Sequence, residues 1–141
     1  TPHGFRVEEE KLGREATAEQ KKLAQEKKLA QQKDSGQRIV DELKQGGMAL
    51  VSVGKGHFTE NGHIMVINGY AKDAKGKEWF FVANPGRRNP DPKDSKYRDG
   101  AVVVDRELTH GAGRVRVSRE TLEKELKYGF TFDPPRAGQT A

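Results

Sequence analysis

Charged and polar residues dominate the first forty positions of the chain, whereas apolar residues gather in short runs between Ile39 and Phe132. Apolar residues that recur every three to four positions predict a helix, and short apolar or alternating runs predict strands. The core is therefore expected to form from the second part of the chain, with little contribution from the first forty residues.

An irregular segment and a helix are predicted at the start of the chain. Thr1 to Glu15 has no apolar periodicity, and we expect it to be irregular. Ala16 to Gln45 is predicted to be helical, with a break at Asp34-Ser35-Gly36, where glycine and two turn formers interrupt the pattern. Gly46-Gly47 then ends the helix.

A central strand and a hairpin are predicted next. Met48 to Val53 is a continuous apolar run of strand length, which is typical of a buried strand. Ile64 to Tyr70 and Lys77 to Ala83 are rich in β-branched and aromatic residues, and the polar run from Lys72 to Gly76 predicts the turn between them. We expect an antiparallel hairpin.

Two short strands and a final helix complete the predicted core. Ala101 to Val104 and Arg114 to Val117 have strand character. Ser118 can cap a helix that continues from Thr121 to Leu126. Asp133-Pro134-Pro135 ends the predicted domain.

His63 and Asn84 are the candidate chemical pair of the hairpin. The numbers of opposed residues in an antiparallel pair have a constant sum, and the midpoint between these two falls inside the predicted turn. The side chains are therefore expected to face each other, so that the asparagine amide oxygen can accept a hydrogen bond from one ring nitrogen. A histidine oriented in this way can act as a base through its other nitrogen.

Three motifs around this pair occur together in one protein family. They are Gly56-His57-Phe58-Thr59, the strand from His63 to Gly69-Tyr70, and Asn84 followed by Pro85. Between Ile39 and Leu126 the chain resembles the C-terminal half of the papain-like cysteine peptidases of the bacteriocin-processing type.

The resemblance assigns a role to each candidate residue. His63 matches the catalytic histidine, and Asn84 matches the third member of the triad, where the family usually has aspartate. His57 matches a recurrent flanking position, and we assign it together with Thr59 to substrate binding. The activity implied is hydrolysis of a peptide amide bond through a Cys-His-Asn triad, without a metal or any other cofactor.

The chain contains no cysteine, so by itself it is expected to be inactive. Three sources of the nucleophile stay open: a segment that precedes Thr1, another chain, or a cysteine replaced by Ala16. The helix that follows Ala16 is too polar for the centre of such a site. Without a nucleophile, the domain would be an inactive relative that binds peptides or proteins.

For the fold, the resemblance implies an α+β papain-like half-domain, which is an antiparallel sheet with flanking helices. We expect a polar helical or flexible segment over 1–35, the subdomain with the histidine and the asparagine over 36–133, and a tail over 134–141. The implied partners are a peptide or protein substrate and the segment or chain that supplies the cysteine helix. Secretion from a bacterium, or delivery into a host as an effector or toxin, completes this expectation.

Charge adds a second class of function. The net charge is +5 and the isoelectric point is near 9.5, which is compatible with a phosphate-bearing partner. The basic residues of the C-terminal half include Arg87, Arg88, Lys93, Lys96, Arg98, Arg114, Arg116 and Arg119. No recognition helix or zinc-ligand spacing accompanies them, so nucleic-acid binding ranks below the hydrolase and the binding module. No apolar run reaches the length of about 18 residues that a membrane span needs.

Overall fold

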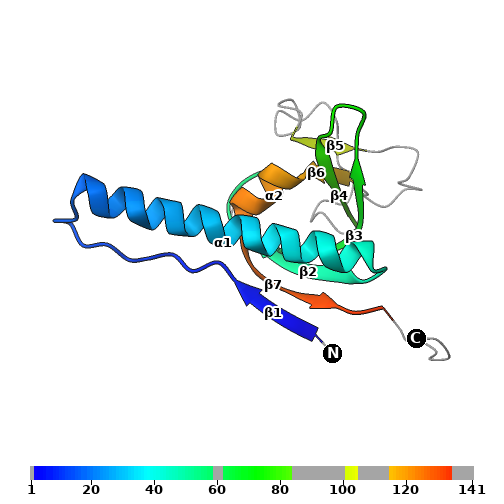
Figure 1. Cartoon of the computed structure of the whole chain (residues 1–141), viewed down its shortest axis with the longest axis horizontal. Coiled ribbons are helices and arrows are strands. Elements are labelled where there is room, and N and C mark those ends of the chain that lie inside the picture. The colour runs from blue at the N-terminus through cyan, green and yellow to red at the C-terminus, as the bar shows by residue number, and fades with distance from the viewer. Residues whose placement is uncertain (1, 59–61, 84–100, 105–114, 135–141) are drawn as a thin grey trace.

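The computed structural model describes residues 2–58, 62–83, 101–104 and 115–134. Within these residues, seven strands form one antiparallel sheet in the order β1-β7-β2-β3-β4-β6-β5, and two helices pack against it (Figure 1). The elements are β1 (Pro2–Arg6), α1 (Ala18–Lys44), β2 (Met48–Val53), β3 (His63–Lys72), β4 (Glu78–Val82), β5 (Val102–Val104), β6 (Val115–Ser118), α2 (Arg119–Glu125) and β7 (Leu126–Phe132). The α+β class is confirmed, as are the predicted strand β2 and the hairpin of β3 and β4.

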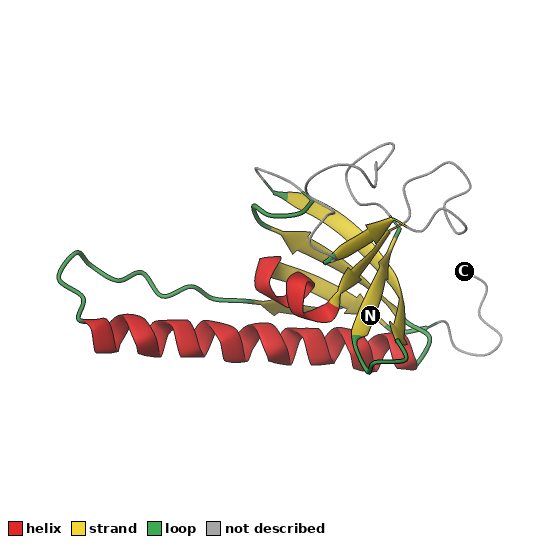
Figure 2. Cartoon of the chain, turned by 90° about the horizontal axis from the view of Figure 1, so that it is seen from above, coloured by secondary structure: helices red, strands yellow, loops and turns green. Residues whose placement is uncertain are grey.

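Both helices share one apolar core with the sheet, and Figure 2 shows them on the same side of it. The largest fully buried side chains are Ile39, Met65, Ile67, Phe80 and Leu122. Alternate residues of the inner strands face this core, because successive side chains of a strand point to opposite faces. The apolar runs that predicted the strands therefore also form the core.

The helix α1 is continuous, so the predicted break at Asp34-Ser35-Gly36 is wrong. Thr17 caps its start, since Thr17 Oγ1 accepts a hydrogen bond from the Gln20 amide at 3.1 Å. Gly36 is buried, and a Cβ at this position would overlap the carboxylate of Glu123 in α2. The glycine thus permits the close approach of the two helices and does not end α1.

The first half of α1 extends beyond the sheet (Figure 2). Its residues are mostly exposed, as the polar sequence predicts. Within the described residues, no helix is both long and apolar enough to cross a lipid bilayer. The boundary that we expected between residues 35 and 36 lies inside this helix.

The first residues of the chain form an edge strand, so the expectation of an irregular segment is wrong for Pro2–Arg6. β1 pairs with β7 in antiparallel register, with Gly4 opposite Phe130. Arg38 of α1 donates a hydrogen bond to the Gly4 carbonyl at 3.0 Å. Phe5 packs against the core. The short strand is therefore held by the sheet on one side and by α1 on the other.

The strand β7 is absent from the sequence-based prediction, which continued the last helix to Leu126. α2 ends at Glu125, and the chain enters β7 directly. The cap at Ser118 is confirmed, because its Oγ accepts a hydrogen bond from the Thr121 amide at 3.3 Å. Leu126 is buried, but it belongs to the strand that lies between β1 and β2 in the sheet.

Arg119, the first residue of α2, connects this helix to α1 and to the sheet. Its guanidinium donates to Glu78 Oε2 at 2.8 Å, to Glu123 Oε2 at 3.1 Å and to Gln37 Oε1 at 3.1 Å. Tyr70 donates to the same oxygen of Glu78 at 2.6 Å. The hydrogen bond from Tyr70 is the largest cause of a lowered pKa at Glu78; burial opposes it, and Arg119 adds to it.

Glu78→Gln is expected to destabilise the fold by about 1–3 kcal/mol at pH 7, because it removes a charged acceptor of two hydrogen bonds. The pKa of Glu78 is lower in the folded chain than the value of about 4.3 in the unfolded chain. Its carboxylate therefore stabilises the fold above that pH, and this contribution is lost as the pH falls through the lowered pKa. The stability difference between native protein and variant should shrink between pH 7 and pH 3.

Urea titrations at the two pH values measure this difference. The matched control is Glu120→Gln, which breaks an exposed pair with Lys124 and should change stability little at either pH. A loss for Glu78→Gln that is the same at both pH values would contradict the assigned role of its carboxylate.

Candidate functional site

Three elements meet at the end of the sheet where β2 finishes. Val53, the last residue of β2, pairs with His63 at the start of β3 and with Leu126 at the start of β7. Neighbouring strands are about 4.8 Å apart. The predicted catalytic histidine and the junction of α2 with β7 therefore lie on either side of the end of β2.

A histidine and a carboxylate form a close pair at this end. Glu125 Oε2 lies 2.7 Å from His57 Nδ1, and Glu125 Oε1 accepts a hydrogen bond from the His57 amide at 2.8 Å. The Glu125 side chain is only 10% exposed and that of His57 is 23% exposed. Since a carboxylate oxygen accepts, Nδ1 carries the ring proton, and in the neutral ring Nε2 is the basic nitrogen.

Local backbone contacts hold this pair in place. The Gly54 amide donates to the Glu125 carbonyl at 2.8 Å, directly after β2 ends. A Cβ at Gly56 would overlap the Glu125 carboxylate, so glycine is needed for the close approach of the loop to the end of α2. Phe58 is buried in the core and anchors the other end of the loop. Residues 54–58 are thus fixed between the sheet and α2.

His63 lies on the helix-covered face of the sheet, at the end where β2 finishes. It has the same strand parity as Met65 and Ile67, which are fully buried in the core, and its own side chain is half-buried.

The predicted partner of His63, Asn84, lies outside the described residues, as does Thr59. The described part of the hairpin has a different register from the predicted one. The predicted offset would pair Phe80 with Ile67, whereas Phe80 pairs with Tyr70. A register shift between Ile67 and Gly69 then brings Val82 opposite Ile67. The predicted spacing rule is therefore wrong for this hairpin, and the pairing of His63 with Asn84 stays a prediction.

Sequence reasoning missed Glu125. It is separated from His57 by 68 residues and lies at the end of a helix that was predicted to continue. No local spacing connects the two residues. A signal was present at Gly54 and Gly56, since two closely spaced glycines in a loop indicate that another part of the chain approaches the backbone.

The described residues contain no group of three or more histidine, aspartate or glutamate side chains arranged to hold a metal ion. The chemistry that the site can support is proton transfer by an oriented imidazole. Cleavage of an amide at such a site would also require a nucleophile.

The basic residues that suggested nucleic-acid binding divide into two groups. Arg116 and Arg119 are described, and both are engaged within the fold: the guanidinium of Arg116 lies 4.7 Å from the Trp79 ring centroid, and Arg119 binds Glu78 and Glu123. The others lie outside the described residues: Arg87, Arg88, Lys93, Lys96, Arg98 and Arg114. The two described arginines therefore contribute to stability and not to an open basic surface.

No protein family, curated protein or solved structure shows a significant match to this chain.

Proposed function

We propose that this chain supplies the histidine-bearing half of a papain-like cysteine peptidase site. His63 is the base, Asn84 orients it, and the nucleophilic cysteine comes from outside this sequence. The observation that supports the proposal most is the position of His63 at the start of β3, opposite the last residue of β2 and beside a loop that the His57–Glu125 pair fixes. The motif resemblance around His57, His63 and Asn84 supplies the class of reaction.

In this mechanism His63 takes the proton of the thiol, and the thiolate attacks the carbonyl carbon of a peptide bond. His63 then donates the proton to the leaving amine, and an acyl-enzyme thioester remains. Water, deprotonated by His63, hydrolyses the thioester and returns the thiol. The His57–Glu125 pair does not exchange protons with the substrate, but it positions the loop that leads into β3.

The test uses the full-length protein that the gene encodes. A pool of fluorogenic peptides should be hydrolysed, iodoacetamide should stop the hydrolysis by alkylating the cysteine, and a chelator should leave it unchanged. Glu125→Gln should lower kcat by up to about 100-fold with little change in KM, because a displaced loop misplaces the base. Hydrolysis that survives complete alkylation would contradict a cysteine nucleophile.

The second candidate is a peptide-binding module without catalysis, which is favoured by the absence of cysteine from the 141 residues. It predicts that peptides bind and are recovered uncut. The same peptide pool, analysed by mass spectrometry after incubation, separates the two candidates.

A further inference from the structure

A cavity of about 360 Å³ lies next to the His57–Glu125 pair. Its walls come from the end of β1, the middle of α1, the loop after β2 and the junction of α2 with β7. Glu125 lines this cavity and also binds His57, so the cavity and the candidate site share one residue. A cavity of this size can hold a few residues of a peptide.

Cationic side chains dominate the lining of this cavity. They are Arg6, Lys28, Lys55, Lys124 and Lys127. Among the described residues, two carboxylates line the same space, and both are already paired: Glu9 lies 3.0 Å from Lys28 Nζ, and Glu125 binds His57. The cavity therefore has an excess of positive charge.

Lys55 and Lys127 carry most of this excess. The side chain of Lys127 lies against Gly54, where an added Cβ would approach its Cε to 2.6 Å, so it is next in space to the loop that carries Lys55. In the described part of the chain, no carboxylate forms an ion pair with either lysine. Two exposed cations that line one cavity repel each other, and an anion between them reduces that repulsion.

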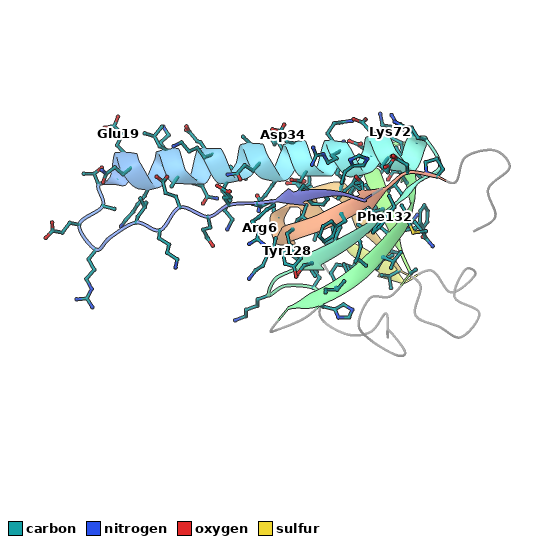
Figure 3. The ribbon with its side chains drawn as sticks, turned by 90° about the horizontal axis from the view of Figure 1, so that it is seen from below. Arg6, Glu19, Asp34, Lys72, Tyr128 and Phe132 are labelled. Carbon is teal, nitrogen blue, oxygen red and sulfur yellow. The ribbon has the colours of Figure 1, made fainter. Side chains whose placement is uncertain are left out.

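Arg6 can also contact an anion in this cavity, from the wall that the end of β1 forms. Figure 3 shows Arg6 of β1 beside Tyr128 of β7, and its guanidinium lies 5.3 Å from the centroid of the tyrosine ring. Stacking on an aromatic ring orients a guanidinium without neutralising its charge. The guanidinium of Arg6 therefore retains its charge for a ligand.

The chain itself places an acidic extended segment at this wall. After β1 the sequence continues Val7-Glu8-Glu9-Glu10, and the Val7 amide donates to the Lys127 carbonyl at 2.8 Å. Glu9 takes Lys28 as its partner, and the Glu8 amide donates to Gln31 Oε1 at 2.8 Å. An extended peptide with carboxylate side chains is thus the kind of chain that this surface already accommodates.

We infer that this cavity binds an acidic peptide and places an aspartate or glutamate side chain between Lys55 and Lys127. The choice of a peptide as the ligand rests on the proposed function, because the cavity adjoins the histidine site through Glu125. The cavity then selects substrates with acidic residues near the bond that is cleaved.

Fluorescence anisotropy tests the inference without requiring hydrolysis. The probes are a dye-labelled Gly-Glu-Glu-Glu-Gly peptide and the same peptide with glutamine for glutamate. The native chain should bind the glutamate peptide at least about tenfold more tightly than the glutamine peptide at an ionic strength of about 0.15 M. The double variant Lys55→Glu with Lys127→Glu should lose most of this difference.

The matched control is Lys21→Glu with Lys22→Glu, which makes the same change of net charge on the exposed first half of α1. It should bind the acidic peptide within about twofold of the native chain, because charges beyond the Debye length of about 8–10 Å are screened at moderate salt. Thermal unfolding of each variant establishes that it is folded. Anisotropy measures binding alone and needs no hydrolysis, so failure of the catalytic assignment and failure of this inference give different results.

Three results would overturn the inference. Equal binding of the two peptides would remove the role of charge, and an equal loss in the control variant would show a general effect of net charge. Tighter binding of a single-stranded oligonucleotide than of the acidic peptide would identify a phosphate-bearing ligand for the cavity.

Discussion

Arg119→Met is expected to lower the free energy of unfolding by about 3–5 kcal/mol. The side chain of Arg119 is 17% exposed and is the partner of Glu78 and Glu123. Burial raises the pKa of Glu123, and Arg119 lowers it. Without the arginine, the buried carboxylate of Glu123 loses its main compensating charge. Removing one partner of a buried ion pair costs more than the pair contributes, because the remaining charge is desolvated. Chemical denaturation at pH 7 measures the loss.

The control on the same helix is Lys124→Met. Lys124 and Glu120 form an i, i+4 pair, and their side chains are 63% and 79% exposed. Exposed pairs contribute about 0–1 kcal/mol, so this variant should remain close to the native stability. Adding Glu123→Gln to Arg119→Met should restore part of the lost stability. Similar losses in the two methionine variants would contradict the central role of Arg119.

Gly129→Ala is expected to destabilise the protein by about 1–3 kcal/mol, as overpacking does. Alanine in the middle of a strand would normally be favourable by about 0.5–1 kcal/mol relative to glycine. Here an added Cβ would lie 2.5 Å from the Leu50 carbonyl oxygen and 2.7 Å from Phe5 Cζ. The oxygen belongs to the backbone of β2, so the strands themselves have to move.

The control is Gly13→Ala, where a Cβ has no atom within 4 Å and the change should be within about 0.5 kcal/mol. Thermal unfolding of the three proteins measures the effect. A gain of stability for Gly129→Ala would show that β7 does not approach β2 and Phe5 as closely as the structure has it.

The inner strands could be predicted from sequence because their apolar runs are also the core. Met48 to Val53 and the two arms of the hairpin were recognisable for this reason. β7 was missed although Leu126, Tyr128, Phe130 and Phe132 alternate with other residues, because that pattern follows a helix without any turn residue between them. β1 was missed because a five-residue edge strand carries little apolar signal and is defined by its partner β7.

The register of the hairpin could not be obtained from residue types. The prediction took the midpoint of the hairpin from His63 and Asn84. In the structure, the register shift between Ile67 and Gly69 changes which residues of β4 pair with β3. The helix break at Gly36 was misjudged for a related reason. Glycine in a sequence can mark a break or a close contact, and only the position of Glu123 in α2 decides between them.

The candidate site could be predicted only in part. The motif around His63 placed this residue at the start of a strand, which the structure confirms. The pair of His57 with Glu125 joins residues far apart in the sequence, so it depends on how α2 and β7 pack against β2. Long-range contacts of this kind are not encoded in local spacing.

The hydrolysis rate of His63→Ala is the most direct test of the proposed function. In the full-length protein that the gene encodes, this variant should lose about 10²–10⁴-fold in kcat, as expected for removal of a general base, and should unfold at the same temperature as the native protein. Lys75→Ala, in the exposed turn between β3 and β4, should keep full activity. Full activity in His63→Ala, with a loss only in His57→Ala, would contradict the assignment of His63 as the base.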